Sequence, residues 1–104
     1  MTWMTEAQLS KKIIEYANSL PSTFAWKYPG TGLGISGIPD VIGSCYGAFF
    51  GIECKRPGAY KNAVDGLSLN QNRRIAQLRA AGAAVLITDS FDEAKEWLDE
   101  HCGT

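Results

Sequence analysis

The sequence predicts an α/β fold in which helices flank a mixed four-stranded sheet, in the order α-β-β-β-α-β-α. Three capping-box patterns, in which Ser or Thr is followed three residues later by Gln or Glu, predict where helices begin. Two apolar runs meet at Tyr46-Gly47, which predicts a hairpin. A further apolar run, 83–88, lies between two helices, and a strand–helix–strand crossover calls for a parallel pair.

The first helix begins after Thr5, whose capping-box partner is Gln8, and Pro21 closes it. Its apolar positions recur at helical spacing: Leu9, Ile13, Ile14, Ala17 and Leu20. A short aromatic strand follows at 24–28. The glycine-rich segment 29–37 lacks the Gly-Lys-Ser/Thr of a phosphate loop, and we interpret it as a flexible connection.

Ser68 with Gln71 predicts the start of a second helix, which runs up to the stop at Gly82. Ser90 with Glu93 predicts the start of the last helix. The last helix buries an apolar stripe made of Phe91, Ala94, Trp97 and Leu98.

The hairpin brings two acids together. We expect strands at 38–45 and 48–55, and a two-residue turn between them then places Asp40 directly opposite Glu53. Lys55 follows Glu53 by two residues and therefore shares its face. One side of the open end of the hairpin thus carries two carboxylates and an ammonium group.

Length and composition set bounds on the molecule. The 104 residues suit a single domain spanning 1–104, and no apolar run approaches the ~20 residues that a membrane span needs. The N-terminus lacks the features of a signal peptide. The odd cysteine count, without a CxxC pair, favours reduced thiols and a cytoplasmic location. The cysteines are Cys45, Cys54 and Cys102.

The net charge of −1 conceals an uneven distribution. Residues 89–104 hold six acids and one base, and residues 1–88 hold nine bases and five acids. The main part of the chain therefore carries +4, which is compatible with a polyanionic partner.

Two opposed carboxylates destabilise a hairpin unless another charge offsets them. A divalent cation is one candidate, because Mg²⁺ takes oxygen ligands from one or two carboxylates, waters and substrate phosphates. The main-chain carbonyl of Cys54 could add another oxygen, and Lys55 would then lie near a metal-bound water. The alternative is a salt bridge, in which Lys55 neutralises Glu53 or Asp40 at the edge of the sheet.

Pro39-Asp40 followed by Glu53-Cys54-Lys55 resembles the PD-(D/E)XK motif of the restriction-endonuclease-like superfamily. The chain is most similar to VRR-NUC domains, small nucleases found alone in phages and bacteria and fused to larger repair enzymes. Four segments carry the resemblance in order: "TEAQLSKKIIEYA", "GIPDVIG", "GIECKRPG" and "LSLNQNRRIAQLRAAGAAVLIT". The resemblance implies a restriction-endonuclease-like core and a phosphodiesterase that depends on Mg²⁺ or Mn²⁺.

The resemblance also implies roles for residues of this chain. Asp40 and Glu53 would be metal ligands, and Lys55 would be the catalytic lysine. Gln71 would support the site from its helix, although the capping box alone also explains a Gln there. Glu6 would reach the metal through water, although an acid in a first helical turn is also favoured by the helix dipole. Glu15 is the alternative helix acid, and we prefer Glu6 because the family's acid lies near the start of this helix.

A phosphodiester substrate needs cationic contacts, which fix affinity and position. Arg56 and Lys61 lie in the segment after the catalytic strand and are the best candidates. Lys27, Arg73 and Arg74 are further candidates. Tyr60, in the same segment as Lys61, could stack on a base.

Cutting both strands of a DNA junction needs two sites, most simply from a two-fold dimer. Stand-alone members of the VRR-NUC family resemble junction resolvases in this respect. The resemblance therefore implies a homodimeric, structure-selective DNA endonuclease acting on branched, Holliday-junction-like DNA in repair in the cytosol of a bacterium or a phage-infected host, with no membrane partner. Phe24, Trp26 or Trp3 could form the dimer face. The alternatives are a sequence-specific or nicking endonuclease with the same site, and a non-catalytic module that binds nucleic acid or a partner.

Overall fold

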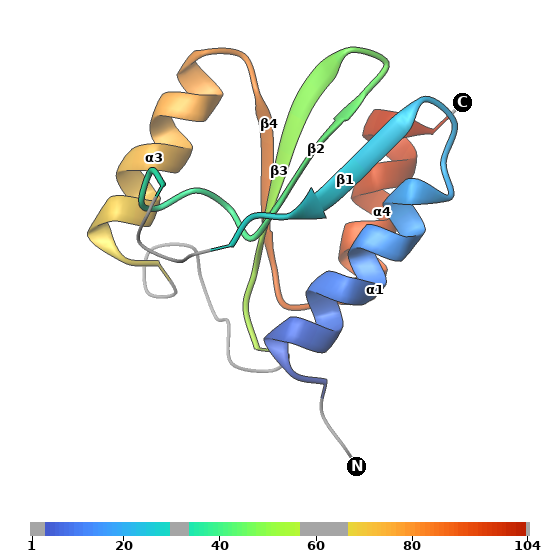
Figure 1. The fold of residues 1–104 in the computed structure, drawn as a ribbon, viewed down its shortest axis with the longest axis horizontal. Coiled ribbons are helices and arrows are strands. Elements are labelled where there is room, and N and C mark those ends of the chain that lie inside the picture. The colour runs from blue at the N-terminus through green and yellow to red at the C-terminus, as the bar shows by residue number, and fades with distance from the viewer. Residues whose placement is uncertain (1–3, 30–33, 57–66, 104) are drawn as a thin grey trace.

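The computed structural model describes residues 4–29, 34–56 and 67–103. In these ranges it confirms the predicted fold class and element order (Figure 1). The elements are α1 (Glu6–Asn18), β1 (Thr23–Lys27), β2 (Val41–Cys45), β3 (Ala48–Cys54), α3 (Leu69–Ala80), β4 (Ala84–Thr88) and α4 (Phe91–Cys102). No helix in the described part of the chain is long and apolar enough to span a bilayer.

The strands form one sheet in the order β1-β2-β3-β4. The first two pairs are antiparallel, and β3 and β4 are parallel, as the crossover through α3 requires. Helices α1 and α4 cover one face of the sheet, and α3 lies on the opposite side (Figure 1). The sheet is therefore the middle layer, and the end at which β3 terminates lies between α1 and α3.

The hairpin has the predicted turn and register. Tyr46 and Gly47 both have positive φ, of 51° and 82°, as a type I′ turn requires. The register pairs Cys45 with Ala48, and its last pair joins Val41 to Ile52. Strand β2 therefore begins three residues later than the predicted residue 38. Pro39 lies in this interval and has no N–H with which to extend the ladder.

The predicted capping boxes differ in outcome. Both reciprocal bonds form at Thr5 with Gln8 and at Ser68 with Gln71. At the third, the hydroxyl of Ser90 accepts from the backbone N–H of Glu93 at 3.3 Å. The N–H of Ser90, however, donates to the hydroxyl of Thr88 at 3.0 Å, so the reciprocal half of this box was predicted wrongly.

Two apolar clusters lie on the two faces of the sheet. The larger one joins α1 and α4 to the sheet and includes Leu9, Ile13, Val41, Phe50, Ile52 and Leu98. The smaller one joins α3 to β4 through Ile75, Val85 and Ile87. The second cluster holds α3 beside the strand that pairs with β3.

The prediction of reduced thiols is wrong for two of the three cysteines. Cys45, at the end of β2, and Cys102, at the end of α4, form a disulfide with a Cα–Cα distance of 5.5 Å. They are 57 residues apart in sequence, and only the packing of α4 on the sheet brings them together. Cys54 remains a free, buried thiol.

Part of the sheet face that carries α3 is left uncovered. Ala25 is buried among the α1 and α4 side chains, so its neighbours Phe24 and Trp26 point to the opposite face. They are 64% and 44% exposed. Phe24 pairs with Ser44, and Ser44 pairs with Phe49, which is 40% exposed. Three aromatic side chains are therefore accessible on neighbouring strands.

Candidate functional site

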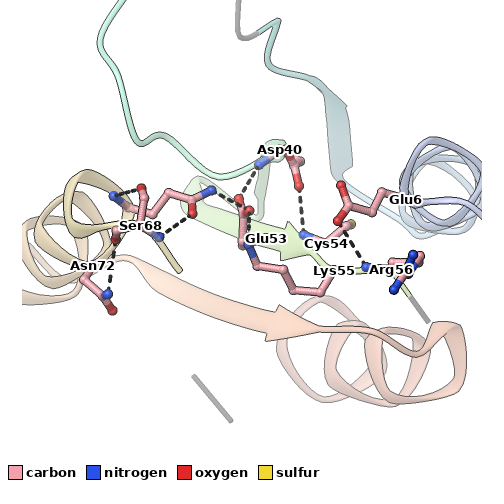
Figure 2. A network of polar contacts seen from close by, with 9 residues as sticks. Glu6, Asp40, Glu53, Cys54, Lys55, Arg56, Ser68 and Asn72 are labelled. Carbon is pink, nitrogen blue, oxygen red and sulfur yellow. Dashed lines mark hydrogen bonds and ion pairs between the residues drawn. The ribbon is translucent and has the colours of Figure 1, made fainter. Parts of the chain in front are cut away.

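The end of β3 brings the predicted acids into direct contact. Glu53 is near the end of the strand, and Asp40 lies one residue before β2. The backbone N–H of Asp40 donates to Oε1 of Glu53 at 3.2 Å, and the N–H of Cys54 donates to Oδ2 of Asp40 at 2.9 Å. Figure 2 shows both bonds at the centre of a polar network. The carboxylate of each acid is thus held by a backbone N–H group from the opposite segment of the hairpin.

Glu53 is the most buried charged side chain of the described site, with only 3% of its surface exposed. Its Oε2 accepts from Nε2 of Gln71 at 2.7 Å and lies 3.4 Å from Nζ of Lys55. Burial, followed by the negative charge of Asp40, raises the pKa of Glu53 from 4.5 to about 7. The positive charge of Lys55 opposes this rise. The carboxyl group is therefore poised to titrate near neutral pH.

The pKa of Asp40 is also raised above its ordinary value. Burial is the largest cause that raises the pKa of Asp40, and the nearby charge of Glu6 adds to it. The hydrogen bond from Cys54 and the charges of Lys27 and Lys55 act in the opposite direction. Burial also raises the pKa of the Cys54 thiol to about 12, so this cysteine is not a nucleophile at neutral pH.

The side chain of Gln71 forms hydrogen bonds both to the start of its own helix and to Glu53. Its Oε1 accepts from the N–H of Ser68 at 3.0 Å, which completes the capping box. Its Nε2 donates to Glu53, so one side chain links the start of α3 to the end of β3. The backbone of Lys55 is fixed from the other side, where its N–H donates to the carbonyl of Thr88 at 2.8 Å. The last strand therefore supports the position of the lysine.

Glu6 approaches the site from α1. It is the first residue of that helix, and its Oε1 accepts from the backbone N–H of Arg56 at 3.1 Å. Figure 2 shows its side chain beside Cys54 and Arg56, on the far side of the network from α3. Glu15, the alternative acid, lies more than two turns further along α1, on the rim of a cavity with Lys11 and Lys27. The geometry thus places Glu6, rather than Glu15, beside the paired acids.

The predicted DNA-binding cations have different surroundings. The side chains of Arg56 and Arg73 are exposed. Lys27 donates from Nζ to the hydroxyl of Ser10 at 3.0 Å, and Ser10 is 2% exposed. Arg74 donates to the carbonyl of Ser36 at 3.2 Å, so it braces the segment before Asp40.

Three residues for which we predicted contacts, Lys61, Tyr60 and Trp3, lie outside the described residues.

Sequence reasoning missed two features of this region. Ser10 anchors Lys27, and nothing in the apolar pattern of α1 distinguishes it from a solvent-facing serine. The end of the glycine-rich segment was interpreted as a flexible connection, yet Ser36 and Gly37 pack against the first turns of α3. Gly37, with φ of 81°, offered a signal, because a Cβ there would lie 2.5 Å from the carbonyl oxygen of Asn70.

The oxygen donors suit a hard divalent cation. Asp40 and Glu53 share one buried site with raised pKa values, and a cation there would offset their repulsion. Within the described ranges, however, no group of three or more His, Cys, Asp or Glu side chains is placed to hold a metal ion by itself. Two carboxylates would therefore need waters and substrate oxygens as further ligands, which is the usual arrangement for Mg²⁺.

Comparison with known proteins finds a similar fold. A solved structure described as "VRR_NUC domain" matches the fold with a TM-score of 0.70 and 26% sequence identity, covering 94% of this chain and 98% of that chain. The resemblance to VRR-NUC domains is confirmed. No model of a protein family matches the sequence, and no curated protein matches it. The VRR-NUC fold is thus recognised through structure, and the roles of individual residues rest on the geometry described above.

Proposed function

We propose that the chain is a metal-dependent DNA endonuclease that hydrolyses phosphodiester bonds, acting as a homodimer on branched DNA. One observation carries the proposal. Asp40, Glu53, Lys55 and Gln71 form a contiguous network at the end of β3, in a fold similar to that of a VRR_NUC domain.

Asp40 and Glu53 would hold Mg²⁺ or Mn²⁺, with the backbone carbonyl of Cys54 as a further oxygen and Glu6 acting through water. When bound, the metal would lower the pKa of a water molecule and polarise the phosphate. The chain's own contribution is to hold two carboxylates close together at a buried site, where Gln71 and the backbone fix their orientation.

Lys55 would act on the phosphate. Its side chain is 17% exposed, and its Nζ lies 3.4 Å from Glu53. A phosphate held beside Glu53 would therefore lie within reach of the ammonium group, which can donate hydrogen bonds to the oxygens on which negative charge develops. Gln71 is a positioning residue, because it acts on Glu53 rather than on the phosphate.

The remaining substrate contacts are proposed from charge and exposure. The side chains of Arg56 and Arg73 are exposed and lie within two residues of Lys55 and Gln71 in the sequence. Lys27, on β1, acts electrostatically on Asp40. Contacts of this kind fix position on the DNA backbone without reading sequence. Lys61 and Arg74 complete the proposed set, Arg74 with part of its guanidinium already bound to Ser36.

Two copies would pair through the uncovered aromatic face of β1, β2 and β3. Phe24 and Trp26 form its centre, with ring centroids 5.5 Å apart, and Phe49 extends it. Exposed aromatic clusters of this kind are typical of protein interfaces. Light scattering should report a dimer for the wild type and a monomer for Trp26→Glu, and a wild-type monomer in the presence of DNA would contradict dimerisation.

The test of the activity is cleavage of labelled four-way junction, flap, single-stranded and plain duplex DNA with Mg²⁺ or Mn²⁺, beside Lys55→Ala. Symmetric nicks in the junction, absent with the variant, would support the proposal. Cutting of plain duplex at fixed sequences would instead support a sequence-specific or nicking enzyme. Folded protein that cuts none of these substrates with either metal would contradict the nuclease proposal and favour a binding module.

A further inference from the structure

A cavity opens beside the catalytic network, on the side of α3. Its volume is about 510 Å³, within the range of about 300–1,000 Å³ that small-molecule sites occupy. Tyr28 and Pro29 form one wall, residues 34–38 form a second, and the first turn of α3 forms the third. Asp40 and Gln71 both line it. Any group in this cavity therefore lies next to the position proposed for the scissile phosphate.

The described walls of the cavity are held by specific contacts. The hydroxyl of Tyr28 donates to the carbonyl of Ile35 at 3.2 Å, and Arg74 fixes Ser36 against α3. A Cβ at Gly34 would lie 2.2 Å from the Tyr28 hydroxyl, so the end of the Tyr28 side chain packs closely on the backbone there. Together with Gly37, whose Cβ would clash with α3, these contacts define a formed wall.

The described lining offers an aromatic ring and polar groups that suit a base. None of the described residues that line the cavity is Lys or Arg, and the acid among them is Asp40. The lining instead offers the half-buried ring of Tyr28 and the side chain of Ile35, which is 58% exposed. The side chain of Asn70, with both donor and acceptor groups, lies on the first turn of α3. Aromatic side chains such as that of Tyr28 are the surfaces on which proteins stack nucleobases.

We propose that this cavity holds the base of one unpaired nucleotide attached to the scissile phosphate. The inference rests on the proposed nuclease function and deepens it. A base within a duplex must first be unstacked and unpaired, whereas a base at a branch point or in a single strand enters at little unstacking cost. Selection of branched DNA would then arise from this cavity as well as from the spacing of two sites in a dimer.

The first test couples a change in the protein to a change in the DNA. Once the cleaved bond is mapped, the nucleotide on either side of it is replaced by an abasic residue. The replacement that removes the base bound in the cavity should lower kcat/KM of the wild type by on the order of tenfold, the usual effect of losing one stacked base. Tyr28→Leu should lose a similar factor on intact DNA and little more on the abasic substrate. Tyr28→Phe keeps the ring and should respond to the abasic residue as the wild type does.

Ile35→Ser provides a second variant at an exposed position, in case Tyr28→Leu does not fold. It should also reduce the effect of the abasic residue. Two results would overturn the proposal while leaving the nuclease function in place. In the first, the loss of rate from each variant and the loss from the abasic substrate combine as independent factors. In the second, neither abasic position changes the rate.

The second test does not depend on cleavage. Thymidine 5′-monophosphate added to the wild type should shift the amide NMR signals of Ser36, Gly37 and Gln71. Deoxyribose 5-phosphate, which lacks the base, should not shift them, and Tyr28→Leu should abolish the response to the nucleotide. If no DNA is cut but this pattern is found, the nucleotide site stands and the nuclease proposal fails. Equal shifts with both ligands, or none with either, would overturn the nucleotide site whether or not the protein cuts DNA.

Discussion

The buried carboxyl group of Glu53 should make the stability of the metal-free protein fall as the pH rises toward neutrality. An acid whose pKa is raised in the folded state binds its proton more tightly there than in the unfolded chain. Its stabilising contribution is therefore complete below the unfolded pKa of 4.5 and is lost as the pH rises through about 7. The cause is burial first and the charge of Asp40 second.

The size of the effect follows from the two pKa values. A change from 4.5 to about 7, at about 1.4 kcal/mol per pH unit, corresponds to roughly 3 kcal/mol in the free energy of unfolding. Glu53→Gln cannot ionise and should lack this component. The variant also loses an acceptor for Gln71, which costs about 1 kcal/mol at every pH and leaves the slope unchanged.

Urea unfolding between pH 4.5 and 8, with EDTA present, measures the difference between the wild type and Glu53→Gln. Relative to the variant, the wild type should lose roughly 3 kcal/mol across this range. Glu15→Gln, which changes an exposed acid of α1, is the matched control and should follow the wild type. Adding Mn²⁺ at pH 7.5 should restore stability to the wild type and to Glu15→Gln but not to Glu53→Gln, because a cation favours the ionised pair. Parallel pH profiles for the wild type and Glu53→Gln would refute the reasoning.

Further predictions address the metal, the DNA and the disulfide. Asp40→Asn should abolish both cleavage and the Mn²⁺-dependent rise in melting temperature, whereas Lys55→Ala should abolish cleavage alone; normal cutting by Asp40→Asn would show that the site is wrong. Lys27→Ala should weaken DNA binding and reduce the slope of log K against log salt concentration by about one, and an unchanged slope in a salt titration would remove Lys27 from the interface. Cys102→Ser should lower the free energy of unfolding by up to about 4 kcal/mol, because the bond to Cys45 closes a long loop. A reducing agent should do the same to the wild type, and urea unfolding with and without it checks this.

Local patterns predicted the fold well because each element carries its own signals. The Tyr46-Gly47 turn follows from two adjacent residues, and the register of the hairpin follows from the turn. The two capping boxes that formed depend only on residues within one helical turn. The failure at Ser90 arises from Thr88, which competes for the same N–H from the end of β4. A capping pattern cannot reveal a competitor in the preceding strand.

The site was predictable to the extent that its residues lie on the hairpin. Asp40 and Glu53 come together through strand pairing, which the sequence specifies. The bond from Gln71 to Glu53 depends on how α3 packs against β4, and no local pattern determines that packing. The disulfide of Cys45 has the same origin, because its partner is brought to it by a helix at the other end of the chain.

The structure also bears on the choice between a salt bridge and a cation site. Lys55 does form an ion pair with Glu53, so the salt-bridge interpretation accounts for one of the two acids. It does not account for Asp40, which makes no ion pair among the described residues and whose pKa is raised, chiefly by burial. One ammonium group at 3.4 Å from Glu53 leaves the pair of acids with a net negative charge in a partly desolvated site. A bound cation would offset that charge, and this is why we favour a metal centre over a structural ion pair.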